Sequence, residues 1–235
     1  MEQWVCTSCG YNMIGDFPEV CPFCGAGRDK FLSWEVAENT YRVTATRVND
    51  SVTQLVSVPK LGLEHAAYRI EMEHEAVWID CPSAFNRTLE PVAKIFFTHP
   101  HFMGASNQYR ELWQAKVYLH ALDAEHALIK AFPLDERFNS DFAIDGLAAH
   151  HIGGHTPGYT FYIYQDVLFI CDYAFPPGSN MHLNPFGPKT ETLQGAERIL
   201  NLVNSRFLKT VCGYNYVCDF NDWLPDFERA LKDRR

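Results

Sequence analysis

Two groups of residues in this sequence have the types and the spacing of metal ligands. Near the N-terminus, Cys6-x-x-Cys9 and Cys21-x-x-Cys24 are two pairs of cysteines, and each pair is followed by a glycine. Each pair presents two thiolates from one tight turn, and the glycine lets the backbone of that turn fold round an ion. Four thiolates suit a tetrahedral site for zinc or iron, and spacing alone does not separate the two metals. About 35 residues bury too little core to fold alone, so we expect the metal to supply folding energy.

The second group begins with His99-Pro100-His101, which follows the apolar run at residues 94–97. This run predicts a buried strand, and a loop at its end can turn both imidazoles towards one point. Imidazole nitrogen is a good ligand for zinc and iron. Two histidines in an ordinary surface loop are the alternative, so the prediction of a site depends on the rest of the chain.

Two further motifs carry polar side chains at the ends of apolar segments. Residues 153–158 read Gly-Gly-His-Thr-Pro-Gly, which marks a tight loop that holds the imidazole of His155 in a fixed place. Residues 167–171 form an apolar strand that ends at Asp172. Because alternate residues of a strand face opposite ways, we expect Cys171, next to Asp172, to point away from the metal.

The overall composition narrows the classes of function. The chain has 235 residues, 47% hydrophobic and 21% charged, which suits one globular domain of about 200 residues with a small module. A formal net charge of −9 argues against a nucleic-acid partner, which requires basic patches. The sequence predicts no membrane span, and its first residues lack the features of a secretory signal. Because four of the eight cysteines stand in metal-type pairs, a reducing cytoplasm is the expected location.

Hydrophobic patterning predicts the elements that position these motifs. Alternation with period two predicts strands over 41–48 and 67–72, and an apolar strand from residue 76 closes on an acid, Asp80. Helices are expected over 103–114, 121–130, 191–204 and 222–232, and strands over 116–120, 159–164, 167–171 and 210–215. Residues 33–40 mix charged and polar types and predict a tether. The isolated histidines, such as His65, are expected to be solvated.

The N-terminal motifs resemble the short rubredoxin module that is appended to rubrerythrins. The resemblance rests on Trp-x-Cys-x-x-Cys-Gly-Tyr from Trp4 onwards and on Cys-Pro-x-Cys-Gly from Cys21 onwards. The loop between the two motifs is much shorter than in free-standing rubredoxins. The resemblance implies a module at residues 1–36 that holds one redox-active iron and transfers electrons. Its ligands would be Cys6, Cys9, Cys21 and Cys24. A structural zinc ribbon is the alternative.

The remaining motifs resemble those of the metallo-β-lactamase superfamily over residues 41–235. Thr-His-x-His after a strand, Gly-Gly-His-Thr-Pro-Gly, and an apolar strand ending in Cys-Asp occur in the order and spacing of that family. The resemblance implies an α/β fold, an αββα sandwich with metals at one edge between its two sheets. It also implies that His99, His101 and His155 are the imidazole ligands of the first metal. Asp172 would be the carboxylate that bridges both metals in dinuclear members.

The sequence departs from this family at every ligand that is private to the second metal. The family's first motif continues to an Asp-His pair, where this chain has Met103 and Gly104. Its last motif places a histidine after a glycine at a strand end, where Gly213 is followed here by Tyr214. We therefore expect one metal in the large domain, iron or zinc. The residues expected to line its pocket are Phe102, Met103, Tyr214 and Asn215.

Together the two resemblances favour an iron-dependent redox protein, in which the module serves a mononuclear metal site. Persulfide dioxygenases resemble this case, with one iron at the first site of the same fold. An iron centre can use a tethered electron carrier, whereas a hydrolase cannot. A mononuclear zinc hydrolase with a structural zinc module, and a non-catalytic metal-binding scaffold, are the alternatives. The small-molecule substrate and the electron-donor protein stay unknown. Electrons could pass within one chain or between the subunits of a homodimer.

Overall fold

The computed structural model describes residues 2–234, and the contacts between residues divide the chain into two compact units. The first unit, Met1–Phe138, contains both cysteine pairs and the His-Pro-His motif. The second unit, Asn139–Arg235, contains His155 and Asp172. This division differs from the predicted boundaries at 36 and 41, which were placed on motif resemblance and stay a prediction.

The cysteine module is built on a small antiparallel sheet with the strand order β2-β1-β3. The strands are β1 (Gln3–Cys6), β2 (Asn12–Ile14) and β3 (Phe31–Ser33), and the 3-10 helix η1 (Arg28–Lys30) precedes β3. The predicted tether is instead a short helix, α1 (Trp34–Thr40), whose first turn is capped by the hydroxyl of Ser33. Ala37 of α1 is buried against Val5 and Leu61. The module is therefore continuous with the rest of the first unit.

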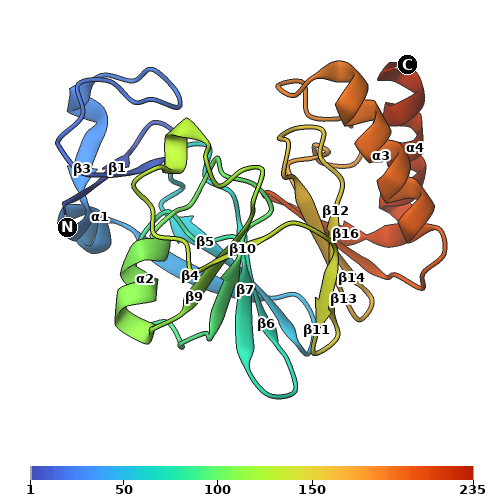
Figure 1. The fold of residues 1–235 in the computed structure, drawn as a ribbon, viewed down its shortest axis with the longest axis horizontal. Coiled ribbons are helices and arrows are strands. Elements are labelled where there is room, and N and C mark those ends of the chain that lie inside the picture. The colour runs from blue at the N-terminus through green and yellow to red at the C-terminus, as the bar shows by residue number, and fades with distance from the viewer. Residues whose placement is uncertain (1, 235) are drawn as a thin grey trace. The chain divides into compact units, whose positions relative to one another are not determined.

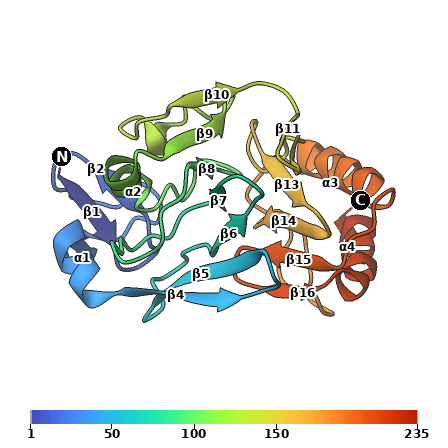
Figure 2. The same ribbon diagram turned by 90° about the horizontal axis from the view of Figure 1, so that it is seen from below.

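A seven-stranded sheet forms the remainder of the first unit, in the order β10-β9-β8-β7-β6-β5-β4 (Figure 2). Its strands are β4 (Arg42–Arg47), β5 (Val52–Val58), β6 (Ala67–Glu71), β7 (Ala76–Ile79), β8 (Lys94–Phe96), β9 (Lys116–His120) and β10 (Glu136–Phe138). Strands β4 to β7 pair antiparallel, and β7 to β10 pair parallel. Helix α2 (Ser106–Trp113) joins β8 to β9 and packs Tyr109 on Trp78, with 4.7 Å between ring centroids.

The helix predicted over 121–130 is wrong. The structure has turns there, followed by the 3-10 helix η2 (Ala127–Ile129). Two histidines explain the difference, because the Nδ1 atom of His120 accepts a hydrogen bond from the backbone of Leu122, and that of His126 from Leu128. Such local bonds between side chain and backbone compete with helical hydrogen bonding.

The second unit is a six-stranded sheet with two helices on one face (Figure 1). The strands, paired in sequence order, are β11 (Phe142–Ile144), β12 (Leu147–His151), β13 (Thr160–Tyr164), β14 (Val167–Cys171), β15 (Thr210–Gly213) and β16 (Val217–Asp219). Helices α3 (Lys189–Val203) and α4 (Phe220–Arg234) lie side by side, and Trp223 and Phe227 of α4 are fully buried in this core. The predicted β13–β14 hairpin is confirmed. Within residues 2–234, no helix has both the length and the apolar character to cross a membrane.

Candidate metal centres

The four cysteines of the module converge on one point. The Sγ atoms of Cys6 and Cys24 are 3.8 Å apart, as are those of Cys9 and Cys21, and all four lie within 4.8 Å of one another. A tetrahedral ion with metal–sulfur bonds of about 2.3 Å has sulfur–sulfur edges of about 3.8 Å. All eight cysteines of the chain are free thiols. The arrangement therefore fits one tetrahedrally bound ion of zinc or iron.

Two short turns bring these sulfurs together. The backbone N–H of Gly10 donates to the carbonyl of Cys6 at 2.8 Å, and that of Gly25 donates to Cys21 at 2.9 Å. The backbone N–H of Tyr11 also donates to the Sγ atom of Cys9 at 3.4 Å. Hydrogen bonds to a ligating sulfur stabilise its thiolate form and help to set the reduction potential of an iron–sulfur site.

Burial and hydrogen bonding shift the pKa values of three of the four thiols. A hydrogen bond from Cys9 lowers the pKa of Cys21 to about 5, and the same bond raises the pKa of Cys9. Burial raises the pKa of Cys6 to about 11. A divalent cation would replace the thiol protons, so metal binding at this site must release protons and depend on pH.

The module is docked on two loops of the first unit through hydrogen bonds to backbone carbonyls. The N–H of Leu63 donates to the carbonyl of Cys9 at 3.1 Å, and the side-chain amide of Asn12 donates to the carbonyl of Ser83 at 3.0 Å. A Cβ atom added to Gly62 would lie 2.4 Å from the carbonyl oxygen of Ser8, so the two backbones approach closely there. These contacts fix the cysteine site relative to the strands that follow it.

One aromatic side chain joins the cysteine site to the His-Pro-His motif. Phe23 belongs to the second cysteine turn, and its ring lies 4.8 Å from the ring of Phe102 and 5.8 Å from the imidazole of His101. The ring of Tyr11 lies nearly parallel to that of Phe23, with 6.4 Å between centroids, and its hydroxyl donates to the carbonyl of Leu128. Three of the four cysteines are buried beneath these rings, whereas Cys24 is exposed.

The first histidine of the motif is oriented by two residues of neighbouring strand ends. The Oγ1 atom of Thr98 lies 3.0 Å from both oxygens of Asp80 and 2.9 Å from Nδ1 of His99. An ionised carboxylate only accepts, so the hydroxyl proton goes to Asp80, and Nδ1–H of His99 donates to the hydroxyl oxygen. This tautomer leaves Nε2 of His99 with its lone pair, which is the form that binds a metal.

Two further imidazoles lie close to His99. The ring of His101 is 4.8 Å from that of His99, so the structure brings the predicted pair together. His65 was expected to be solvated, but only 7% of it is exposed. Its ring lies 5.4 Å from His99 and 4.4 Å from Phe102. The expectation for His65 is therefore wrong, because the loop between β5 and β6 folds back beneath the module.

The positions that would carry a second metal's ligands in this unit are occupied by packing residues. Met103 is buried in the core of the seven-stranded sheet. Gly104 has a φ of +51°, and a Cβ atom there would lie 2.4 Å from the carbonyl oxygen of Pro82. A histidine at residue 104 would therefore require the backbone to move.

In the second unit, His155 and Asp172 form the other predicted pair. Nε2 of His155 lies 3.5 Å from Oδ2 of Asp172, and both residues are buried. The side-chain amide of Asn184 donates to Oδ2 of Asp172 at 2.9 Å and to its backbone carbonyl at 3.1 Å. The hydroxyl of Tyr159 lies 3.4 Å from the other carboxylate oxygen. Because the Tyr159 hydroxyl donates its one proton to the carbonyl of Ile170 at 2.6 Å, it is the amide of Asn184 that donates to the carboxylate and orients it.

The strand that leads to Asp172 is irregular at its last residue. Cys171 has a φ of +47°, and the pairing of β14 with β15 shifts between Phe169 and Cys171. The Sγ atom of Cys171 lies within 4.8 Å of a carboxylate oxygen of Asp172. The expectation that Cys171 points away is therefore wrong, because strand alternation does not hold through an irregular position.

The residues expected to line the pocket have different surroundings. Phe102 is buried between Phe23 and His65, whereas Tyr214 is half-buried and packs on Phe175, with 5.5 Å between ring centroids. Asn215 is exposed. Their role as a pocket lining stays a prediction.

Sequence reasoning missed three residues of these sites. Asp80 was seen only as the acid that closes a strand, although a strand end beside β8 is where an orienting carboxylate would lie. Asn184 stands in a long loop rich in proline and glycine, without a local motif. His65 also has no signal in the sequence, because its position depends on long-range packing.

Comparison with known proteins agrees with both resemblances. Residues 4–32 match the rubredoxin-like domain of rubrerythrins. Reverse rubrerythrin-1 from Clostridium acetobutylicum is 54% identical over 33 residues, and the match covers 14% of this chain and 18% of that protein. The chain thus has a rubredoxin-like N-terminal module and spans under a fifth of the curated relative it matches.

Solved structures define the fold of the remainder. A metallo-β-lactamase from Pontibacter korlensis superposes with a TM-score of 0.65 at 17% identity, covering 82% of this chain and 100% of that one. The mono-zinc form of FIM-1 from Pseudomonas aeruginosa gives 0.66 at 14% identity, covering 81% and 95%. The predicted metallo-β-lactamase fold is confirmed, and at these identities the likeness is one of fold alone.

Proposed function

We propose that this chain is an iron-dependent redox protein, in which the rubredoxin-like module delivers electrons to a single metal held by His99, His101, His155 and Asp172. The observation that carries the proposal is the contact between Phe23 of the second cysteine turn and the imidazole of His101. A structural zinc module would need no such contact with a candidate ligand. A carrier of electrons needs a short, fixed route to its acceptor.

The donor set suits iron or zinc at the large-domain site. Three imidazoles and one carboxylate are borderline ligands, and a histidine–carboxylate set with open positions is typical of non-haem iron. Each half of the set is already oriented within its own unit, because Thr98 fixes the tautomer of His99 and Asn184 holds the carboxylate of Asp172. Met103 and Gly104 offer no ligand for a second ion, which supports a count of one.

Iron bound at both sites would supply one-electron chemistry. The chain's own contribution is the route between the sites and the exclusion of water from it. Phe23 and Phe102 are packed against the imidazoles, and Cys6, Cys9 and Cys21 are buried. Cys24 is the exposed sulfur, so a donor protein would approach the module on that side.

The full chain, expressed with both iron and zinc available, tests this proposal. Metal analysis is expected to give one iron at the module, with a visible spectrum that bleaches on reduction, and one iron in the large domain. Replacing Cys24 with Ser should slow reduction of the large-domain iron by a chemical donor, while the iron content of that domain stays the same. Cys218→Ser, at a half-buried thiol outside both sites, is the matched control. A colourless protein with zinc at both sites would contradict the proposal.

A further inference from the structure

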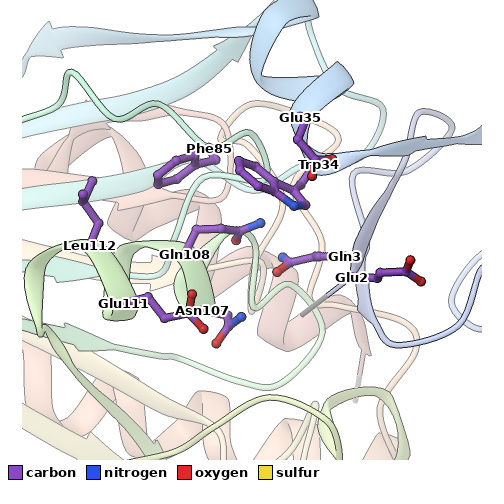
Figure 3. A pocket seen from close by; sticks show the side chains of 9 residues that line it. All are labelled: Glu2, Gln3, Trp34, Glu35, Phe85, Asn107, Gln108, Glu111 and Leu112. Carbon is purple, nitrogen blue, oxygen red and sulfur yellow. The ribbon is translucent and has the colours of Figure 1, made fainter.

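Buried side-chain amides stabilise both units, at different places. In the first unit, Gln3 lines a cavity together with Gln108 (Figure 3). Its amide donates to Asn12 at 2.9 Å, a bond within the cysteine module. In the second unit, the buried amide belongs to Asn184, which stands in the loop between β14 and α3 and is only 1% exposed. This second amide lies against candidate metal ligands, so the groups that fix it bear on the metal site.

The side chain of Asn184 contacts both candidate ligands of its own unit. Its Nδ2 atom donates to Oδ2 of Asp172 at 2.9 Å and lies 3.4 Å from Nε2 of His155. Its Oδ1 atom accepts a hydrogen bond from the backbone N–H of Phe186 at 2.9 Å, and this bond fixes which end of the amide is nitrogen. Asn184 can therefore orient the carboxylate only while its own backbone stays in place.

Two contacts hold the backbone of Asn184. Its N–H donates to the carbonyl of Tyr173 at 2.9 Å, which ties the loop to the residue after Asp172. Its carbonyl accepts a hydrogen bond from the guanidinium of Arg234 on α4, and the same Nη1 atom donates to the carbonyl of Leu183 at 2.9 Å. One nitrogen thus bridges two consecutive carbonyls, both of them on residues that are 1% exposed.

This bridge explains why the loop depends on Arg234. Buried backbone carbonyls need donors, and each one left unpaired costs free energy. Without the guanidinium, the carbonyls of Leu183 and Asn184 lose their side-chain donor, and the segment gains by turning towards water. The amide of Asn184 then moves with its backbone, and the carboxylate of Asp172 loses the donor that orients it.

A second arginine of α4 holds the same loop at its far end. Arg229 donates through Nη2 to the carbonyl of Gly178 at 2.6 Å. It also pairs with Asp226, whose carboxylate accepts from the N–H of Gly178. Gly178 is exposed and stands well before Asn184 in the loop. Arg229 therefore offers a matched comparison, because it is the same residue type on the same helix, bonded to the same loop but away from the amide.

We propose that Arg234 is a positioning residue of the large-domain metal site. It acts through Asn184, whose backbone it holds and whose amide orients the carboxylate of Asp172. This role rests on the proposed function, because Asp172 is a ligand only if the large domain binds a metal. Helix α4 thus contributes to metal affinity, although none of its residues is among the candidate ligands.

Chelator competition on the iron-loaded full chain, followed by metal analysis, measures the affinity of the large-domain site. Asn184→Leu is expected to weaken it about 10- to 100-fold, and Arg234→Ala about five- to tenfold. Arg234→Lys should retain most of the affinity, because both bonds come from one nitrogen and an ammonium group can supply both donors. Arg229→Ala, the matched control, should change the affinity by less than about twofold.

A double variant distinguishes positioning from a general loss of structure. If Arg234 acts through Asn184, adding Arg234→Ala to Asn184→Leu should weaken metal binding little further, because the two changes break one connected route. An arginine that merely supports the fold would instead give losses that add. Full additivity would therefore overturn the proposal.

Nuclear magnetic resonance tests the geometric step without iron. In the zinc-loaded full chain, which is diamagnetic, the side-chain NH₂ signals of Asn184 are identified by their loss in Asn184→Leu. Arg234→Ala should shift these signals and speed their hydrogen exchange, whereas Arg229→Ala should leave them unchanged.

Unshifted signals in Arg234→Ala would overturn the proposal, as would shifted signals with an unchanged metal affinity. A wild type that binds no metal in its large domain would contradict the proposed function, and with it the role of Arg234. Failure of that role alone leaves the wild-type affinity intact, so the two failures are distinguishable.

Discussion

The ring of Phe23 lies 5.8 Å from the imidazole of His101, with an angle of 57° between their planes. The two residues belong to motifs that lie far apart in the first unit's sequence, and each motif carries a different set of candidate metal ligands. Their contact means that the second cysteine turn lies against one candidate ligand of the proposed large-domain site, within the first unit.

Phe23→Leu is expected to slow the reduction of the large-domain metal by at least about tenfold without changing the metal content of either site. Leucine fills a similar volume but removes the aromatic contact with His101, and small displacements between redox partners cost large factors in rate. Stopped-flow absorbance at the module's visible band measures the rate. Phe17→Leu is the control, because Phe17 stacks on Trp4 in the same module, with 4.3 Å between ring centroids. Equal rates in the wild type and Phe23→Leu would rule out this route.

Thr98→Val is expected to weaken metal binding in the large domain about 10- to 100-fold. Valine keeps the shape of threonine but removes the hydroxyl that lies between Asp80 and Nδ1 of His99, so the imidazole loses its fixed tautomer. Competition with a chelator, followed by metal analysis, measures the change. Thr44→Val, on the exposed face of β4, should leave the affinity unchanged. An unaltered affinity in Thr98→Val would show that the tautomer is set by other groups.

Gly104→Ala is expected to destabilise the protein by about 3 kcal/mol or more, because the new Cβ atom meets both a left-handed backbone and the carbonyl of Pro82. Gly15→Ala separates the cost of the left-handed backbone from the cost of the steric clash. Gly15 also has a positive φ, but a Cβ atom there has nothing within 4 Å, so a loss of about 1 to 2 kcal/mol is expected. Urea unfolding of the metal-loaded proteins gives both values. Similar losses in the two variants would mean that residue 104 could accommodate a side chain.

The buried carboxyl group of Glu64 is expected to make the free energy of unfolding depend on pH. Its carboxyl group is buried beneath the module, and desolvation raises its pKa even though Ser57 and Ser83 donate hydrogen bonds to it. A carboxyl group whose pKa is higher in the folded state favours folding below its unfolded pKa of about 4.3, and this contribution is lost as the pH rises through the folded pKa. The free energy of unfolding of the wild type minus that of Glu64→Gln should therefore fall as the pH rises from about 4.

Urea unfolding at several pH values measures that difference. Glu73→Gln is the control, since Glu73 is exposed, and its difference from the wild type should be nearly independent of pH. A Glu64→Gln difference that rises with pH would mean that the hydrogen bonds from the two serines outweigh the cost of burial.

The sequence predicted the features that depend on local spacing. The cysteine pairs of the module converge as expected, because each Cys-x-x-Cys-Gly turn is determined by its own five residues. The hairpin of β13 and β14 and the strand β9 were also predicted, since hydrophobic alternation and turn residues are local signals. The helix α2 was predicted as well, but it begins at Ser106 because Gly104 is left-handed.

Long-range packing is what the sequence did not predict. Phe23 has no local signal that it will contact His101, and His65 becomes a neighbour of His99 only once the loop after β5 folds beneath the module. The segment at residues 33–40 looked like a tether because its composition is polar. It is a helix because Ser33 caps it and because Ala37 finds an apolar partner in Leu61.

The close approach of Gly62 to Ser8 also bears on how such a chain can evolve by recombination. A rubredoxin-like module grafted from another protein would bring its own first cysteine turn, and that turn must meet the backbone of the loop between β5 and β6 without a side chain in between. Exchange at the predicted module boundary, residue 36, would alone leave this fit to chance. Residues 61–64 would have to travel with the module, so the inherited unit is larger than the motif that defines it.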